Sequence, residues 1–439
     1  MHDLVSIPCV FHRGGTSRGL FFHERDLPGR ERWDDIFLAA MGSPDVRQIN
    51  GLGGATSHTS KVAVISPSGQ SGMDVDYLFA QVGIDEPVVD YKGMCGNLLA
   101  AVGPFAVDEG LVDAVEPVTA VKVFNVNTSK RFIVHVPVCE GHSISQGDYS
   151  IYGVSGTGAK YRVDFLNPAG AYSGKLFPTG RAVDTIEIKD YGSLEVTILD
   201  VANPMVFIRA KDLGIENLAG EDPRKADAKR LALLEKLRCL ACHRAGFIDD
   251  PQKASEKLPA VPRLALIQPP CDAQTLDGRK LKKEDMDLYS HMLSMKKIHQ
   301  SYAATGAVCL AVAACVPGTV VGSVLTGSRD EKDSKIKSST IRFGHPSGLM
   351  EVEVEGGEDG ELKRVSMART ARRLMDGWTG WCMYLLRCLN DSSLSPHFIV
   401  KLPIDVESNK IFKGKIITPK LLGGNAIGNI ELKAQGKRR

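Results

Sequence analysis

The sequence predicts an α+β protein of two similar lobes, each a mostly antiparallel sheet wrapped around a central helix. Apolar or alternating runs typical of strands recur along the chain with few helices between them. Two helical segments, at 98–102 and 303–312, consist almost only of small apolar residues. A helix that is apolar all round belongs in a core, so each segment is expected to fill one lobe.

The two helical segments also open alike. Residues 305–312 (TGAVCLAV) align with residues 95–102 (CGNLLAAV), so an apolar helix with a small-residue opening occurs twice, once in each half. A helix N-terminus presents unpaired N–H groups and the positive end of the helix dipole. Two such ends directed at a shared cleft would form a site for a small, doubly charged anion.

Length and composition narrow the class of protein. The 439 residues exceed what one core usually holds, and 43% hydrophobic with 24% charged residues is ordinary for a globular protein. The net charge of +2 favours neither nucleic acid nor a membrane surface as a partner. No charged-then-apolar leader opens the chain, so we expect a cytoplasmic protein whose ten cysteines are reduced. The uncharged run 302–326 contains glycines and a proline, which favour a buried helix and a following Val-rich strand over a membrane span.

Near the N-terminus, two runs typical of strands flank a glycine-rich turn, which predicts a hairpin. Thr16, Ser17 and Arg18 lie at its tip and offer two hydroxyls and a guanidinium, a set suited to a carboxylate. The alternative is a solvated hairpin tip without a ligand.

A long loop rich in glycine and hydroxyl residues, 48–60, then leads into an apolar strand that begins at Lys61. Its small residues would let the backbone approach a ligand closely. A lysine at the edge of the core is partly desolvated, which favours the neutral amine that can act as a base. The alternative is a lysine that extends into solvent.

Cys95 stands where a loop gives way to the first apolar helix. A thiol at a helix N-terminus is favoured as thiolate by the helix dipole. The alternative is a small buried hydrophobic residue, one of ten cysteines.

Several further elements are expected from periodicity. Residues 34–41 and 222–246 should be helices, the second amphipathic, and strands are expected at 73–81, 118–126, 131–136 and 161–166. From about residue 378 the composition changes, and 407–439 is polar and lysine-rich.

Several motifs in order, over roughly residues 5–378, resemble the PrpF family. They are 13–19 (RGGTSRG), 51–54 (GLGG), 59–63 (TSKVA), 95–97 (CGN) with 101–106 (AVGPFA), 203–204 (NP), 344–348 (GHPSG) and 368–372 (ARTAR). The resemblance implies a fold like diaminopimelate epimerase, with the site between the lobes. It also implies isomerisation of unsaturated di- and tricarboxylates without cofactor or metal.

The resemblance places the family's lysine and cysteine on Lys61 and Cys95, and His299 matches a histidine near some family sites. The second helix opens with Thr305-Gly306, which disfavours a racemase with two facing thiols. The residues expected to hold the substrate come from the hairpin, the loop and the two helix N-termini: Thr16, Ser17, Arg18, Gly53, Gly54, Ser60, Gly96, Asn97, Thr305 and Gly306.

The expected reaction removes a proton from one carbon and returns one, with Lys61 and Cys95 as base and acid. We favour Lys61 as the base, and the reverse assignment stays open. Aconitate or 2-methylaconitate is the expected substrate, with an oxalomesaconate tautomerase or a methylitaconate isomerase as the alternative. A non-catalytic carboxylate-binding protein is the alternative from another class.

The expected lobes are 1–185 and 186–378, with possible exchange of a terminal strand, followed by an extension of unknown role at 379–439. We expect a small di- or tricarboxylate as partner, no nucleic acid, no membrane and a homodimer.

Overall fold

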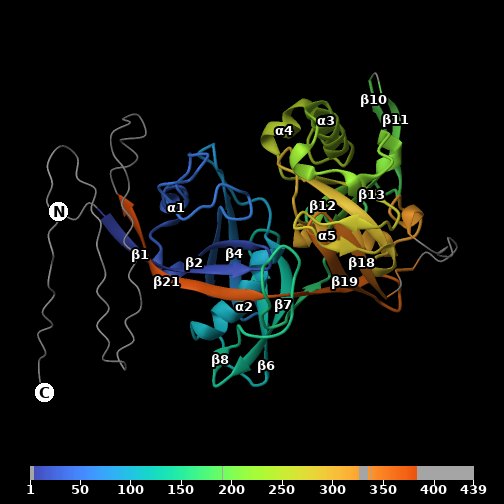
Figure 1. Ribbon diagram of the computed structural model, residues 1–439. Coiled ribbons are helices and arrows are strands. Elements are labelled where there is room, and N and C mark those ends of the chain that lie inside the picture. The colour runs from blue at the N-terminus through green and yellow to red at the C-terminus, as the bar shows by residue number, and fades with distance from the viewer. Residues whose placement is uncertain (1–3, 190, 326–334, 337, 383–439) are drawn as a thin grey trace, which may run out of the picture. The chain divides into compact units, whose positions relative to one another are not determined.

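The computed structural model describes residues 4–189, 191–325, 335–336 and 338–382. The fold is α+β, as predicted. Within these residues, one sheet of 19 strands runs through both halves of the chain (Figure 1). The extension at 383–439 lies outside the described residues.

The first half places its strands around helix α2, Gly96–Asp108. A shorter helix, α1, spans Trp33–Met41, close to the predicted 34–41. The strands are β1 Leu4–Gly14, β2 Ser17–His23, β3 Lys61–Pro67, β4 Val75–Val82, β5 Val89–Asp90, β6 Val118–Asn125, β7 Lys130–Cys139, β8 His142–Ser143 and β9 Tyr161–Leu166. The N-terminal hairpin and the four strands predicted from periodicity are confirmed.

The second half places its strands around helix α5, Ala304–Cys315. Helices α3, Ala228–Arg244, and α4, Ala254–Lys257, lie outside its sheet. The strands are β10 Asp184–Ile188, β11 Gly192–Val201, β12 Asn203–Arg209, β13 Arg263–Gln268, β14 Ala273–Gln274, β15 Lys280–Leu281, β16 Leu288–Ser294, β17 Lys297–Ile298, β18 Ser339–His345 and β19 Gly348–Gly356.

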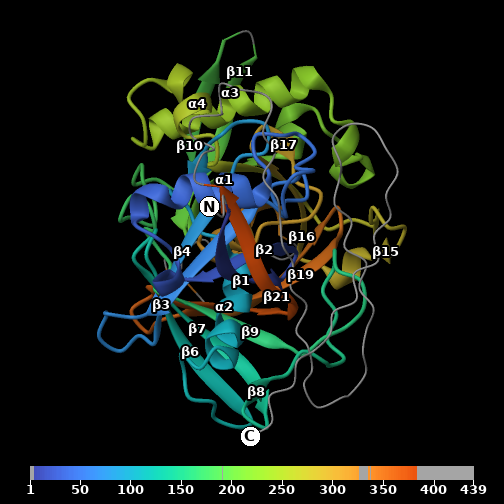
Figure 2. The same cartoon turned by 90° about the vertical axis from the view of Figure 1, so that its left-hand side faces the viewer.

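Two last strands join the halves. Strand β20, Leu362–Arg369, pairs with β9 of the first half and with β19 of the second. Strand β21, Ala371–Cys382, then returns to the first half and pairs antiparallel with β1, so the last described strand lies beside the first (Figure 2). This strand crosses residue 378, where the sequence placed the start of the extension.

Both central helices are buried because their small apolar residues let the sheets approach from every side. All twelve residues of α5 are buried, as are residues 96–107 of α2. At Gly103 a Cβ atom would lie 2.6 Å from a methyl group of Val134, so only glycine fits between α2 and β7. The core helices predicted from composition are therefore confirmed.

Two predicted elements were wrong. The helix expected at 222–246 begins only at Ala228, because the Asp227 side chain accepts a hydrogen bond from Arg230 N and caps the helix there. The Val-rich segment after α5 is not a strand. The Thr319 hydroxyl donates to Ala313 O and accepts from Gly322 N, which holds that segment in a turn.

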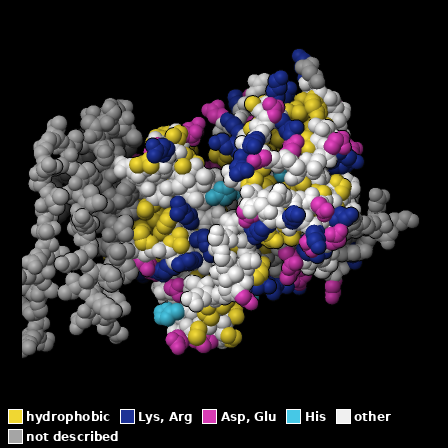
Figure 3. All heavy atoms as spheres, viewed as in Figure 1, with side chains coloured by type: hydrophobic (Ala, Val, Ile, Leu, Met, Phe, Trp, Pro, Cys, Tyr) yellow, Lys and Arg dark blue, Asp and Glu magenta, His cyan; other side chains and the backbone are white. Residues whose placement is uncertain are grey.

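The surface agrees with the small net charge of the chain. On the face shown in Figure 3, basic and acidic side chains are interspersed over both halves. None of the helices in the described ranges is long and apolar enough to cross a membrane.

Candidate active site

Cys95 is the N-cap residue of α2, where the sequence placed it. Its backbone is extended, and its Sγ accepts a hydrogen bond from Leu98 N at 3.5 Å. The thiol lies 3.9 Å from the Ser17 hydroxyl, and the residue is 8% exposed. The Tyr77 hydroxyl donates to Cys95 O at 3.3 Å and fixes the backbone. The first turn of α2 therefore presents a sulfur atom where an anion would be stabilised.

Lys61 is the first residue of β3 and is 8% exposed. Its Nζ donates to Gln81 Oε1, and the Gln81 amide in turn donates to Ser60 O at 2.8 Å. The ammonium group also lies 5.0 Å from the centre of the Phe79 ring. Burial lowers the pKa of the Lys61 amine, and a negative charge on Cys95, present only in the thiolate form, would act in the opposite direction. The predicted partial desolvation of Lys61 is thus present, and Lys61 and Cys95 interact electrostatically.

The second half contributes Arg263, which the sequence reasoning missed. It is the first residue of β13, and its Nη1 donates to the Thr305 hydroxyl in the first turn of α5 at 2.7 Å. Burial lowers the pKa of Arg263, and the charge of Cys95 raises it. Arg263 in turn lowers the pKa of Lys61. A cation from the second half therefore acts on both Lys61 and Cys95.

A local signal could have found Arg263. Like Lys61, it is a lone charge directly ahead of an apolar strand, here 264–267 (LALI). The two cations begin β3 and β13, one in each half.

Two histidines complete the site. The rings of His58 and His299 are 4.2 Å apart in an edge-to-face arrangement. Burial and then the charge of Lys61 lower the pKa of His58 to about 4. Burial lowers the pKa of His299 well below its usual range, and positive charge on His58 and Arg263 would lower it further. Both rings are neutral near pH 7, and His58 was not named from the sequence because it stands alone in the glycine-rich loop.

The hairpin brings Thr16 and Ser17 to the first turn of α2, while Arg18 contacts Phe11 and the glycine-rich loop. The Asn97 amide donates to the Thr16 hydroxyl at 3.1 Å and accepts from Arg369 Nε at 3.2 Å. The Arg18 guanidinium lies 5.3 Å from the centre of the Phe11 ring. A Cβ at Gly54 would come within 2.8 Å of Arg18 Nη2, so this glycine makes room for the arginine.

The N-termini of the two central helices touch, and Gly96 is the point of contact. A Cβ at Gly96 would lie 3.1 Å from Ala304 Cβ and 3.3 Å from Thr305 Cγ2. The helix caps align Cys95 with Ala303, two residues before the Thr305 that the repeat suggested. The second helix therefore presents an apolar cap residue opposite the thiol.

Three predicted binding residues have other contacts instead. Ser60 is fully buried, and its hydroxyl accepts from the Gln48 amide at 2.7 Å. A Cβ at Gly53 would collide with Gln48 Oε1, so this glycine also packs on Gln48. A Cβ at Gly306 would lie 2.8 Å from Met292 Sδ. These residues shape the loop and the helix packing, and binding of substrate by them stays a prediction.

Several buried polar atoms at this site lack a hydrogen-bond partner among the described residues. They are His58 Nε2, Arg263 Nε and Ser301 Oγ. Buried polar atoms normally have hydrogen-bond partners, and the Arg263 and Ser301 groups can donate to an anion, as can His58 when Nε2 carries the proton. A cavity of about 260 Å³ lies on the Thr16 side of Asn97 and is lined in part by Thr16, Tyr149 and Arg369, but not by Lys61 or Cys95. In the described part of the chain, no group of three or more His, Cys, Asp or Glu side chains is placed to hold a metal ion.

The fold and the site together define an α+β protein of two similar halves. Its site has a buried lysine and a thiol that caps the N-terminus of one central helix, where the two helix N-termini meet. The model of the PrpF protein family matches residues 4–381. The chain belongs to this family, as its motifs suggested.

The chain aligns with known relatives over almost the whole length of each relative. The chain is 43% identical to a 3-methylitaconate isomerase of Eubacterium barkeri, covering 86% of this chain and 98% of the relative. It is 38% identical to a 2-methyl-aconitate isomerase of Cupriavidus necator, covering 85% and 96%. The crystal structure of a methylitaconate-delta-isomerase superposes with a TM-score of 0.72 at 42% identity, covering 87% of this chain and 96% of that one.

Proposed function

We propose that the chain is a cofactor-independent isomerase that moves a double bond, or changes its geometry, in an unsaturated di- or tricarboxylate. The observation that carries this proposal is the buried amine of Lys61 interacting with the Cys95 thiol at the N-terminus of α2. Two proton-transferring groups of different chemistry in one closed site are suited to removing and returning a proton. The names of two relatives, 3-methylitaconate isomerase and 2-methyl-aconitate isomerase, support the same reaction.

In the proposed mechanism, Lys61 takes a proton from the substrate and Cys95 donates one. The lowered pKa of Lys61 supports this direction, because a base must first be neutral. The carbanion formed between the two steps spreads its charge into a neighbouring carboxylate. Cations and N–H groups held in place stabilise that charge without reorganising, and Arg18, Arg263 and the N-terminus of α2 would supply them.

We propose aconitate or 2-methylaconitate as the substrate. Two arginines from different halves, together with two helix N-termini, offer enough positive groups for three carboxylates. 3-Methylitaconate, a dicarboxylate, is the second candidate because the relative at 43% identity is named for it. Oxalomesaconate is the third, since a 4-oxalomesaconate tautomerase of Pseudomonas putida is 38% identical.

One screen tests the proposal. The purified chain is incubated with each of these acids, and the change in ultraviolet absorbance is followed together with that of the Lys61→Ala variant. Conversion of at least one acid by the wild type and not by the variant is expected. Binding of these acids without conversion would instead indicate a carboxylate-binding protein and refute the isomerase.

We further infer two lobes at 1–185 and 186–378, a homodimer and a cytoplasmic location. Strand β21 would be the terminal strand that the second lobe returns to the first. Light scattering of the purified chain tests the dimer, and cell fractionation tests the location.

A further inference from the structure

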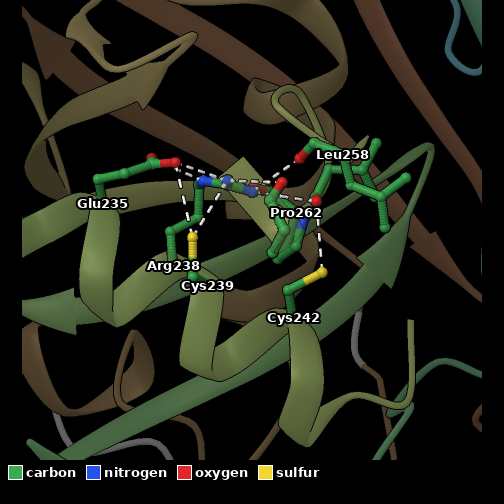
Figure 4. A network of polar contacts seen from close by, with 8 residues as sticks. Glu235, Arg238, Cys239, Cys242, Leu258 and Pro262 are labelled. Atoms are coloured by element: carbon green, nitrogen blue, oxygen red, sulfur yellow. Dashed lines mark hydrogen bonds and ion pairs between the residues drawn. The ribbon is translucent and has the colours of Figure 1, made fainter. Parts of the chain in front are cut away.

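A buried arginine on the outer helix α3 carries contacts that the proposed reaction does not use. Arg238 is 1% exposed and forms a two-pronged ion pair with Glu235, one turn earlier on the same helix. Its Nε donates to Glu235 Oε2 at 2.8 Å and its Nη2 to Glu235 Oε1 at 2.7 Å. Figure 4 shows the guanidinium lying between this carboxylate and the carbonyl groups of another segment.

That segment is 254–262, which leads from α4 to β13. Arg238 Nη1 donates to Leu258 O at 2.9 Å and to Val261 O at 3.1 Å, and Nη2 donates to Ala254 O at 3.3 Å. The Cys242 thiol, one turn later on α3, also contacts Val261 O at 3.6 Å. One charged side chain thus binds three carbonyls of this segment at once, in addition to the backbone N–H groups that Ala254 O and Leu258 O already accept.

The residue that follows this segment is Arg263. It begins β13, and its Nη1 donates to the Thr305 hydroxyl at the N-terminus of α5. The backbone of β13 is fixed by pairing with β12 on one side and with β16 on the other. The segment just before Arg263 is held by Arg238. The Arg238 contacts therefore fix the chain at the residues that lead into Arg263.

We propose that Arg238 is a positioning residue for the reaction, which holds segment 258–262 so that Arg263 can bind a substrate carboxylate. This rests on the proposed function, in which Arg263 is a carboxylate ligand. Arginine suits the role because its planar group has five N–H donors in a fixed fork, enough for Glu235 and the carbonyls together. A lysine would keep the charge and lose most of these bonds.

The first test is structural and needs no substrate. The variant Glu235→Leu with Arg238→Met removes both charges, because removal of one alone would leave a buried charge without its partner. The matched control is Glu221→Leu with Arg230→Met, a half-buried ion pair between Arg230 in the first turn of the same helix and Glu221 of the segment before it. Hydrogen exchange of residues 258–266 should be faster in the first variant and unchanged in the control. Equal exchange in the two variants would overturn the proposal.

The second test is a double-mutant cycle, in which kcat/KM is measured for Glu235→Leu/Arg238→Met, for Arg263→Ala and for the two changes combined. With Arg263 present, the Glu235→Leu/Arg238→Met change should raise KM about tenfold and alter kcat less than twofold. In the Arg263→Ala background the same change should alter kcat/KM less than twofold. Equal losses in both backgrounds would show that Arg238 acts on the fold alone and would overturn the positioning role. An inactive wild-type chain would refute the proposed function separately, because the exchange experiment reports on the contacts by itself.

Discussion

The contact between the helix N-termini at Gly96 gives a sharp prediction for the variant Gly96→Ala. The added methyl group would lie 3.1 Å from Ala304 Cβ, 3.3 Å from Thr305 Cγ2 and 3.4 Å from Phe165 Cζ. The first two distances are shorter than ordinary van der Waals contacts. Because Ala304 Cβ is attached directly to the backbone of α5, that helix must shift by a few tenths of an ångström.

The expected cost in stability is small and the cost in activity larger. Overpacking a buried site typically costs about 1–3 kcal/mol. Replacing glycine by alanine in a helix returns up to about 1 kcal/mol, so the free energy of unfolding should fall by about 0–2 kcal/mol. Thr305 moves with α5 and carries Arg263 with it. Since a misplacement of about 1 Å can cost about a hundredfold in rate, a shift of a few tenths should lower kcat/KM about three- to tenfold.

The assay is urea unfolding together with steady-state kinetics on the converted acid. Gly93→Ala is the matched control, because a Cβ there would meet nothing within 4 Å. The control should retain both stability and activity. Wild-type kcat/KM in Gly96→Ala would refute the reasoning that this glycine sets the spacing of the two helix ends.

Three further predictions concern the chemistry and the charges. Lys61→Ala and Cys95→Ser should each keep a cooperative unfolding transition and lose about two to four orders of magnitude in kcat, and near-normal turnover in either would remove that residue from the mechanism. Arg18→Ala should raise KM about ten- to a hundredfold, since a charge-assisted bond contributes about 1.5–3 kcal/mol, and an unchanged KM would return Arg18 to a structural role. Burial lowers the pKa of His291 to about 4 and, with the charge of Arg369, that of His345 to about 3. In the unfolded chain these histidines take up their protons near pH 6.5, while in the folded chain they stay neutral. Each should therefore lower the free energy of unfolding by about 3 kcal/mol as the pH falls from 6.5 to 4, and a free energy of unfolding from urea titration that does not change over this range would contradict the prediction.

The features that the sequence predicted correctly depend on local patterns. The uniformly apolar composition of α2 and α5 allowed only buried helices, and Cys95 was placed at a cap because a loop met a helix there. Lys61 was found because it is a charged residue that begins an apolar strand directly after a polar loop. Each of these signals lies within about ten residues of chain.

The position of the missed site residues depends on contacts between distant segments, although Arg263 also carried a local signal as a lone charge ahead of an apolar strand. Arg263 meets Thr305 because β13 inserts between β12 and β16, an arrangement that no local period encodes. His58 becomes part of the site only because the loop of one half packs on His299 of the other. The start of α3 at Ala228 was missed for a different reason, since two aspartates offered competing caps.

The pairing of β21 with β1 bears on how the chain can be made. During synthesis β1 emerges first, and its outer edge must wait for residues 371–382 before it gains this partner. Strand β9 likewise waits for β20. Until then the first half presents open strand edges, which are templates for association with other chains. A fragment that ends between the halves would keep both of these edges open, so the first half expressed alone should aggregate.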